Sequence, residues 1–185
     1  MLVMKKIRTL MLTALALIMG AMTAFASPEN PTNEEVMTAL TRATTVFEWF
    51  EHNPLPTDGK ERFDSGYMLY YSVSDPTIHN MLDLKAAVHD IFTDSLASFI
   101  ISGNKMYRQA DNKLFVAPAA KKANPLKGTP TYSLSRPSSD RIVVTAKTPV
   151  YADKEHKTLV KTESVDFPYV KTAKGWRFSY FESLK

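Results

Sequence analysis

The hydrophobic residues of this chain change their spacing near residue 105, and this change constrains the fold more than any other feature of the sequence. Before it, apolar residues recur every three or four positions, which is typical of helices with one packed face. After it, short runs rich in apolar and aromatic residues are separated by turn residues, which is typical of strands. Helices followed by neighbouring antiparallel strands predict an α+β fold, with N-terminal helices packed on a curved antiparallel sheet.

The first 26 residues are predicted to be a secretory signal peptide. Three basic residues precede a short apolar run at 10–22, and Ala24-Phe25-Ala26 is an A-x-A cleavage site. The apolar run is shorter than the about 20 residues that a membrane helix needs. We therefore expect cleavage after Ala26. The protein is expected to be secreted or to lie in the cell envelope, extracellular or periplasmic, without a membrane anchor after cleavage.

The remaining residues, 27–185, are expected to form a single domain, and a monomer. They carry 20 basic and 19 acidic side chains, so the positive charge of the whole chain belongs to the leader. Nucleic acid, which requires a standing positive field, is therefore not an expected partner. The chain has no cysteine, which excludes disulfides, thiolate nucleophiles and cysteine metal sites.

Residues 32–51 are predicted to form the first helix. Thr32 and Glu35 have the spacing of a capping box, in which each side chain accepts a hydrogen bond from the backbone amide of the other residue. The apolar residues of this segment recur at helical spacing and are expected to face the core. They are Val36, Leu40, Ala43, Phe47 and Phe50.

Two further helices are predicted before the change of spacing. Asp75-Pro76 is typical of a helix start, and this helix is expected to continue to residue 92. Thr93 is expected to cap the next helix, which Gly103 ends in a left-handed conformation. The side chains expected to face inward are Ile78, Met81, Leu82, Val88 and Phe92 in the second helix, and Leu96, Phe99 and Ile100 in the third.

The strands are predicted mostly in the second half of the chain. A hairpin is expected around Asp111-Asn112-Lys113, and residues 67–73 are expected to be a short strand or an extended link. Two segments rich in turn residues, 53–66 and 117–130, are expected to be loops. The remaining strands are predicted at 131–135, 141–148, 158–170 and 176–181. Cystatin-like and NTF2-like folds have this order of elements.

A metal site is not predicted. His79, Asp83 and Asp90 lie on one side of the second predicted helix, within about 40° of one another. However, Asp90 lies two turns beyond Asp83, which is roughly 10 Å along the helix axis, so one ion cannot reach all three side chains. These residues are interpreted as a solvated polar face.

The other histidines and serines form no catalytic motif. His89 is expected to be a packed, hydrogen-bonded core residue, and His52 and His156 are expected to lie in loops or turns without a fixed partner. Residues 102–105 match the S-x-x-K string of penicillin-binding enzymes, but that motif needs a helix where Gly103 predicts a helix end. The chain contains no G-x-S-x-G string and no phosphate-binding glycine loop. We therefore predict no catalytic, cofactor-binding or metal-binding residue, and no enzymatic activity.

The aromatic residues leave one alternative open. They are interpreted mainly as core, but NTF2-like folds hold pockets on the concave side of the sheet. The alternative function is therefore an exported module that binds a small apolar ligand in an aromatic-lined cavity. The residues considered for this cavity are Tyr67, Tyr70, Tyr71, Trp176, Phe178, Tyr180 and Phe181.

Four short strings occur in an order that is similar to a known family. Tyr67-Met68-Leu69-Tyr70 precedes an acidic segment and a helix, and Phe92-Thr93 joins that helix to the next. Asn112-Lys113-Leu114 lies in the predicted hairpin, without the glycine that the family has there, and Gly175-Trp176-Arg177 lies near the C-terminus. In this layout the chain resembles the secreted inhibitors of bacterial cell-wall DL-endopeptidases, the IseA (YoeB) family.

The resemblance implies a protein without chemistry of its own. Members of this family bind the catalytic domain of an NlpC/P60-type peptidase, cover its catalytic cleft and so moderate autolysis of peptidoglycan. Because a loop on a rigid sheet can fill a cleft, the segments 53–66 and 117–130 are the expected contacts with the peptidase. The candidate contact residues are Asp58, Lys60, Glu61, Arg62, Lys121, Lys122, Asn124 and Lys127.

Overall fold

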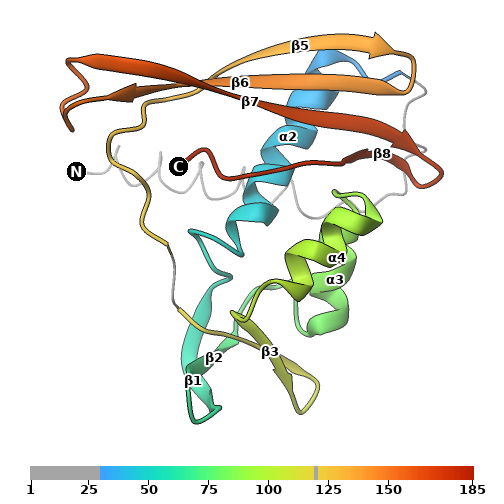
Figure 1. Cartoon of the computed structure of the whole chain (residues 1–185). Helices are drawn as coiled ribbons and strands as arrows, with labels where there is room; N and C mark the ends of the chain where they lie inside the picture. Colours follow the sequence, from blue (N-terminus) through green and yellow to red (C-terminus); the bar gives the residue numbers. More distant parts are fainter. Residues whose placement is uncertain (1–29, 119–120) are drawn as a thin grey trace, which may run out of the picture.

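A computed structural model describes residues 30–118 and 121–185 of the chain. These residues form two four-stranded antiparallel sheets, and three helices lie between the sheets (Figure 1). The predicted α+β class is confirmed, but the prediction of one sheet is wrong, because the strands before residue 117 form a sheet of their own. The predicted signal peptide, 1–26, lies outside the described residues.

The first sheet contains a strand that the sequence did not predict. Its strands lie in the order β1-β2-β4-β3, and are β1 (Thr57–Asp64), β2 (Leu69–Val73), β3 (Tyr107–Ala110) and β4 (Lys113–Val116). The predicted loop 53–66 is therefore wrong over β1, where Phe63 is the one side chain that is not exposed. The hairpin between β3 and β4 is confirmed, and its turn residues Asp111 and Asn112 have φ of 46° and 59°.

The second sheet is a meander that the sequence predicted well. It contains β5 (Thr131–Ser138), β6 (Arg141–Tyr151), β7 (Leu159–Thr172) and β8 (Gly175–Phe178), in the order β5-β6-β7-β8. On β6, alternate residues from Ile142 to Thr148 are buried, as a strand with one covered face requires. The last strand ends three residues earlier than predicted, so Tyr180 lies beyond it and is exposed.

Helix α2 (Asn33–Glu48) begins with the predicted capping box. The Thr32 amide donates to Glu35 Oε2 at 2.7 Å, and the Glu35 amide donates to Thr32 Oγ1 at 3.2 Å. The helix ends about a turn before the predicted end at residue 51. Its predicted inner face is buried except for Phe47, which is half-buried, and Val46 is buried with it.

Helix α3 (Met81–His89) starts later than predicted. Asp75 Oδ1 accepts hydrogen bonds from the Thr77 and Ile78 amides at 2.8 and 3.0 Å, which closes a turn and not a helix. The cap is Asn80, whose Oδ1 accepts from the Leu82 amide at 2.8 Å. The buried face of this helix is formed by Leu84 and Val88, and Leu82 was predicted to face inward but lies on the opposite side and is 75% exposed.

Helix α4 (Asp94–Ser102) starts after Thr93 as predicted, although the Thr93 side chain makes no capping hydrogen bond. Phe99 was predicted to face inward but is 74% exposed, whereas Ile100 is buried. The predicted left-handed end is also wrong, because Gly103 has φ of −73°. Because the helix ends at Ser102, the lysine of the S-x-x-K string at 102–105 lies beyond the helix.

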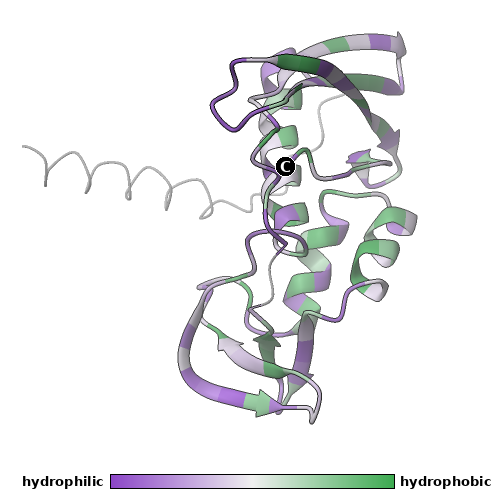
Figure 2. Ribbon diagram, turned by 60° about the vertical axis from the view of Figure 1, so that its left-hand side comes forward, coloured by the Kyte–Doolittle hydropathy of each residue, from purple (hydrophilic) through white to green (hydrophobic). Residues whose placement is uncertain are grey.

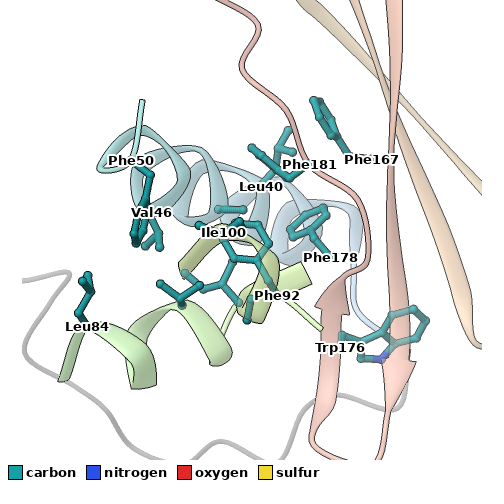
Figure 3. Packing of buried hydrophobic residues seen from close by; sticks show 14 of the residues in the cluster. Leu40, Val46, Phe50, Leu84, Phe92, Ile100, Phe167, Trp176, Phe178 and Phe181 are labelled. Atoms are coloured by element: carbon teal, nitrogen blue, oxygen red, sulfur yellow. The ribbon is translucent and has the colours of Figure 1, made fainter. Parts of the chain in front are cut away.

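The main hydrophobic core joins all three helices to the inner face of the second sheet (Figure 3). At its centre the rings of Phe92, Phe178 and Phe181 pack together, with centroids 5.5 Å apart for Phe92 and Phe181 and 5.6 Å for Phe178 and Phe181. The backbone reinforces this contact, since the Thr93 amide donates to Phe178 O at 2.9 Å and the Phe178 amide to Ile91 O at 3.0 Å. The junction of α3 and α4 is thus fixed to β8.

Tyr107 connects the first sheet to the end of α2. Its buried hydroxyl donates to Trp49 O at 2.9 Å and accepts from the Leu55 amide at 3.0 Å. Its ring packs edge-on against Phe50, with centroids 5.2 Å apart. Burial raises the pKa of the Tyr107 hydroxyl, so this group remains a neutral donor over the range in which proteins are stable.

The Tyr107→Phe variant is expected to lower the free energy of unfolding by about 2 kcal/mol, because a half-buried carbonyl and a buried amide lose their partner. Urea unfolding followed by tryptophan fluorescence measures this loss. The matched control is Tyr132→Phe, since the Tyr132 hydroxyl makes no hydrogen bond within the residues that the structure describes, and no destabilisation is expected there. Equal losses in the two variants would contradict the role given to Tyr107.

Candidate functional site

The β1–β2 hairpin ends in a turn, residues 65–68, that presents a fully exposed aromatic side chain. Tyr67 is the most exposed large hydrophobic residue of 30–118 and 121–185. The turn is held by hydrogen bonds from the Ser65 amide to Met68 O at 3.2 Å, and from the Met68 amide to Ser65 Oγ at 3.1 Å. Gly66, with φ of 82°, supplies the left-handed residue of the turn. Tyr67 is therefore held out on an ordered turn, which we call the hairpin tip.

The hairpin tip lies at the end of the molecule opposite to the second sheet (Figure 1). Behind it, Phe63, Tyr70 and Phe115 form a small aromatic cluster, with the Phe63 ring 6.0 Å from the Tyr70 ring and 6.2 Å from the Phe115 ring. The Tyr70 hydroxyl also donates to Lys105 O at 2.9 Å. The hairpin thus has a hydrophobic support of its own, separate from the main core.

Four of the predicted contact residues lie on β1, just before the hairpin tip. Figure 2 shows this strand as mainly hydrophilic. Lys113 Nζ contacts both carboxylate oxygens of Glu61, at 2.7 and 2.8 Å, and so ties β1 to β4. The backbone amide of Lys60 donates to Asp58 and is the main cause of the lowered pKa of this carboxyl. Arg62 is exposed and makes no ion pair with a described residue.

The other predicted contact segment, 117–130, is a linker between β4 and β5. Lys121 is tied to the end of α2: its amide donates to Glu51 O at 2.8 Å, and its ammonium group pairs with the Glu51 carboxylate. Lys127 pairs with Glu163 on β7 at 3.1 Å. Lys122 is exposed, and Asn124 bonds only within the linker, accepting from the Leu126 amide.

The structure does not bring the two predicted contact segments together at one place. The linker leaves the first sheet and runs along the molecule to β5, away from the hairpin tip (Figure 1). At Lys121, the linker contacts a histidine. His52 Nδ1 is 2.8 Å from Lys121 O, and His52 Nε2 is 2.9 Å from Ser183 Oγ in the C-terminal segment. The prediction that His52 has no fixed partner is therefore wrong.

The remaining histidines also serve structural contacts. His156, likewise predicted to have no partner, stacks on Tyr151 with centroids 4.5 Å apart, and its Nε2 is 3.0 Å from Pro125 O. His89 was predicted to be a core residue but is only half-buried; its Nδ1 is 3.0 Å from Asp94 Oδ1. The hydrogen bonds of Lys174 and then of His89 lower the pKa of Asp94.

The polar face of α3 is occupied by internal contacts. Asp83 accepts from the His79 amide at 2.9 Å and belongs to the cap of α3. Asp90 pairs with Arg42 and with Arg177, each at 3.1 Å, and so connects α3 to α2 and β8. Within the described residues, no three side chains of the types that bind metals come close enough to hold an ion.

The aromatic residues considered for a ligand cavity do not line one cavity. Trp176, Phe178 and Phe181 are buried in the main core, whereas Tyr70 belongs to the small cluster behind the hairpin tip. The rest of the set is more exposed: Tyr67, Tyr71 and Tyr180.

Residues 67–73 are predicted to be a strand or an extended link, but in the structure Tyr67 lies in the turn 65–68, before β2 begins at Leu69. Tyr67 directly follows Asp64, Ser65 and Gly66 in the sequence. Aspartate, serine and glycine together are a turn signal between two extended segments, and this signal could have located the hairpin tip.

No described helix has the length and hydrophobicity needed to cross a bilayer. Comparison of the sequence with models of known protein families finds no match, and no curated protein matches it either.

Proposed function

We propose that this chain is an exported, non-enzymatic inhibitor that binds the catalytic domain of a cell-wall peptidase, with the hairpin tip inserted into the catalytic cleft. The observation that carries this proposal is the fully exposed Tyr67 on a hydrogen-bonded turn. The occupied cleft would exclude the peptide substrate, so inhibition requires no chemistry from the inhibitor.

The geometry of the hairpin favours binding to another protein. Tyrosine is enriched among the residues that dominate interface energies, and it offers a large contact area with few rotatable bonds. Because the turn is already ordered, little backbone freedom is lost when a partner binds. The charged side chains of β1 supply the polar rim that surrounds such a contact in other interfaces.

The choice of target comes from the resemblance to the DL-endopeptidase inhibitors. The proposed target is an NlpC/P60-type domain, and the consequence of its inhibition is slower hydrolysis of peptidoglycan stem peptides. We also propose that this part of the fold is cystatin-like. Helix α2 packs on the four-stranded antiparallel sheet β5–β8, which is the arrangement that such a fold requires. The expected location is the cell envelope or the external medium.

The purified chain is expected to inhibit a DL-endopeptidase catalytic domain with saturable, near-stoichiometric titration. The measurement is the release of peptide fragments from peptidoglycan at increasing inhibitor concentration. A lysozyme-type glycosidase acting on the same peptidoglycan is the control, because it cuts the sugar chain and its cleft is of a different kind. Inhibition of neither enzyme, and no binding to several NlpC/P60-type domains, would refute the proposal.

A further inference from the structure

A groove of about 300 Å³ lies beside α2, and no residue of the hairpin tip lines it. Its walls come from α2, from linker residues 123–130, from β5 and from the C-terminal tail, which we define as 179–185. The volume is at the lower end of the range found for sites of small organic ligands. Segments that are distant in the sequence thus form one concave surface that the proposed peptidase contact does not use.

The floor of the groove is apolar and firmly packed. It is made by Leu40, Phe47, Phe167 and Phe181. The Phe181 ring lies 4.6 Å from the Phe167 ring and 5.4 Å from the Phe47 ring. Figure 3 shows Phe181 between Leu40 on α2 and Phe167 on β7. Since three of these side chains also belong to the buried core, the floor is preformed and favours an apolar ligand.

Three of the four charged side chains that line the groove are paired with an opposite charge within the chain. Glu48 Oε1 lies 2.7 Å from Lys185 Nζ, and Lys127 pairs with Glu163 at 3.1 Å. Glu182 accepts a hydrogen bond from the Tyr180 hydroxyl. A charged ligand would have to separate one of these pairs or remain unpaired in a partly apolar site. The groove is therefore matched to an uncharged molecule.

One polar group of the lining has no partner. Tyr132 on β5 is 40% exposed, and its hydroxyl makes no hydrogen bond within the described ranges 30–118 and 121–185. Partial burial raises the pKa of this hydroxyl, so it is a neutral hydrogen-bond donor at physiological pH. An acceptor on a ligand in the groove would satisfy it.

We infer that this groove binds a small, uncharged, largely apolar molecule that carries one hydrogen-bond acceptor, and that Tyr132 donates to that acceptor. The inference does not depend on the peptidase target. It also differs from the cavity considered from the sequence, because Phe181 is the one residue common to the two sites.

The probe for this site is 6-propionyl-2-dimethylaminonaphthalene, an uncharged naphthalene with one ketone, whose emission moves to the blue in apolar surroundings and to the red when the ketone is hydrogen-bonded. Titration of the full chain is expected to give a saturable blue shift with one site. The Tyr132→Phe variant is expected to bind about fivefold more weakly, as for the loss of one hydrogen bond, with emission still further to the blue.

A matched pair of variants on α2 tests the location. Thr44 lines the groove, whereas the next residue, Thr45, is exposed and does not, and both hydroxyls bond only to backbone oxygens of α2. The Thr44→Phe variant is expected to fill the groove and to weaken probe binding at least tenfold, and Thr45→Phe to leave it unchanged. The conservative Tyr132→Phe variant keeps the test valid if Thr44→Phe does not fold.

Three results would overturn the inference. The first is the absence of a saturable shift with the unmodified chain. The second is an equal change of probe affinity in Thr44→Phe and Thr45→Phe. A Tyr132→Phe variant with unchanged affinity and unchanged emission counts in the same way. The third is tighter binding of the anionic probe 1-anilinonaphthalene-8-sulfonate than of the uncharged one, since the paired charges of the groove predict the opposite order.

Discussion

Replacement of Phe92 by alanine is expected to lower the free energy of unfolding by about 3–5 kcal/mol. Phe92 is fully buried where α3 and α4 meet, and its ring packs against Phe47 on α2 and Phe181 in the C-terminal tail, with centroids 6.4 and 5.5 Å away. Its removal opens a cavity where the helices, the tail and the second sheet meet. Since domains of this kind are stable by about 5–15 kcal/mol, the variant loses a large share of the total.

Urea unfolding, followed by the fluorescence of Trp49 and Trp176, measures this effect. The matched control is Phe99→Ala, the same substitution on α4 at a side chain that is 74% exposed. A change within about 0.5 kcal/mol is expected for the control. If the two variants lost the same free energy, Phe92 would not be the centre of the core that the ring contacts indicate.

The second large effect is expected at the hairpin tip. If Tyr67 enters a peptidase cleft, Tyr67→Ala should raise the inhibition constant by at least 30-fold, which corresponds to about 2 kcal/mol for a dominant interface residue. Because the side chain is fully exposed in the free chain, the free energy of unfolding should not change. Inhibition of a DL-endopeptidase and urea unfolding, measured on the same preparation, separate binding from stability.

Tyr180→Ala is the control for this prediction, because Tyr180 is an exposed tyrosine of the C-terminal tail. Figure 1 shows the C-terminal end of the chain far from the turn between β1 and β2. Unchanged inhibition is expected for it. Should Tyr67→Ala inhibit as well as the unmodified chain, the hairpin tip would not be the contact. Replacement of linker residues 121–124 by glycine and serine would then test the second predicted segment, where Lys122 is exposed.

Helices and strands that depend on residues only a few positions apart could be predicted from the sequence. The capping box of α2 needs only Thr32 and Glu35, three residues apart, and both of its hydrogen bonds are present. The β3–β4 hairpin needs only two residues that tolerate positive φ, Asp111 and Asn112. The second sheet could be predicted from alternation, as on β6, because one face of each strand is covered by the core.

Strand β1 could not be found in this way. Its residues do not alternate, since its side chains are exposed on both faces apart from Phe63. It becomes a strand through its pairing with β2 and the contact of Glu61 with Lys113, a residue 52 positions away. Interactions between residues so far apart in the sequence do not produce a local pattern of apolar residues. The segment was therefore predicted to be a loop.

The start of α3 was misplaced because two residues offer the same chemistry. Asp75 and Asn80 can each accept hydrogen bonds from the amides two and three positions ahead, and in the structure both do. At Asp75 the bonds close an isolated turn, whereas at Asn80 they begin a helix. Asp83 makes the difference, because its carboxylate accepts a hydrogen bond from the Asn80 amide and so completes a capping box.

The candidate sites were only partly accessible to sequence reasoning. The charged residues of β1 and of the linker were predicted from the sequence as contact residues, but their partners Lys113, Glu51 and Glu163 come from elsewhere in the fold. The groove brings together residues as distant as Leu40 and Phe181, and no spacing in the sequence relates them. Local patterns thus identify polar segments, and only the tertiary structure shows which side chains remain free.

The attachments at the two ends of α2 have a mechanical consequence. Arg136 on β5 holds Pro31 O at 2.7 Å just before the helix, and Lys185 in the C-terminal tail pairs with Glu48 at its end. A helix of 16 residues is about 24 Å long, so the two ends of the described chain are fastened roughly that far apart. A pulling force applied between them acts along the helix axis and loads α2 and its packing in shear.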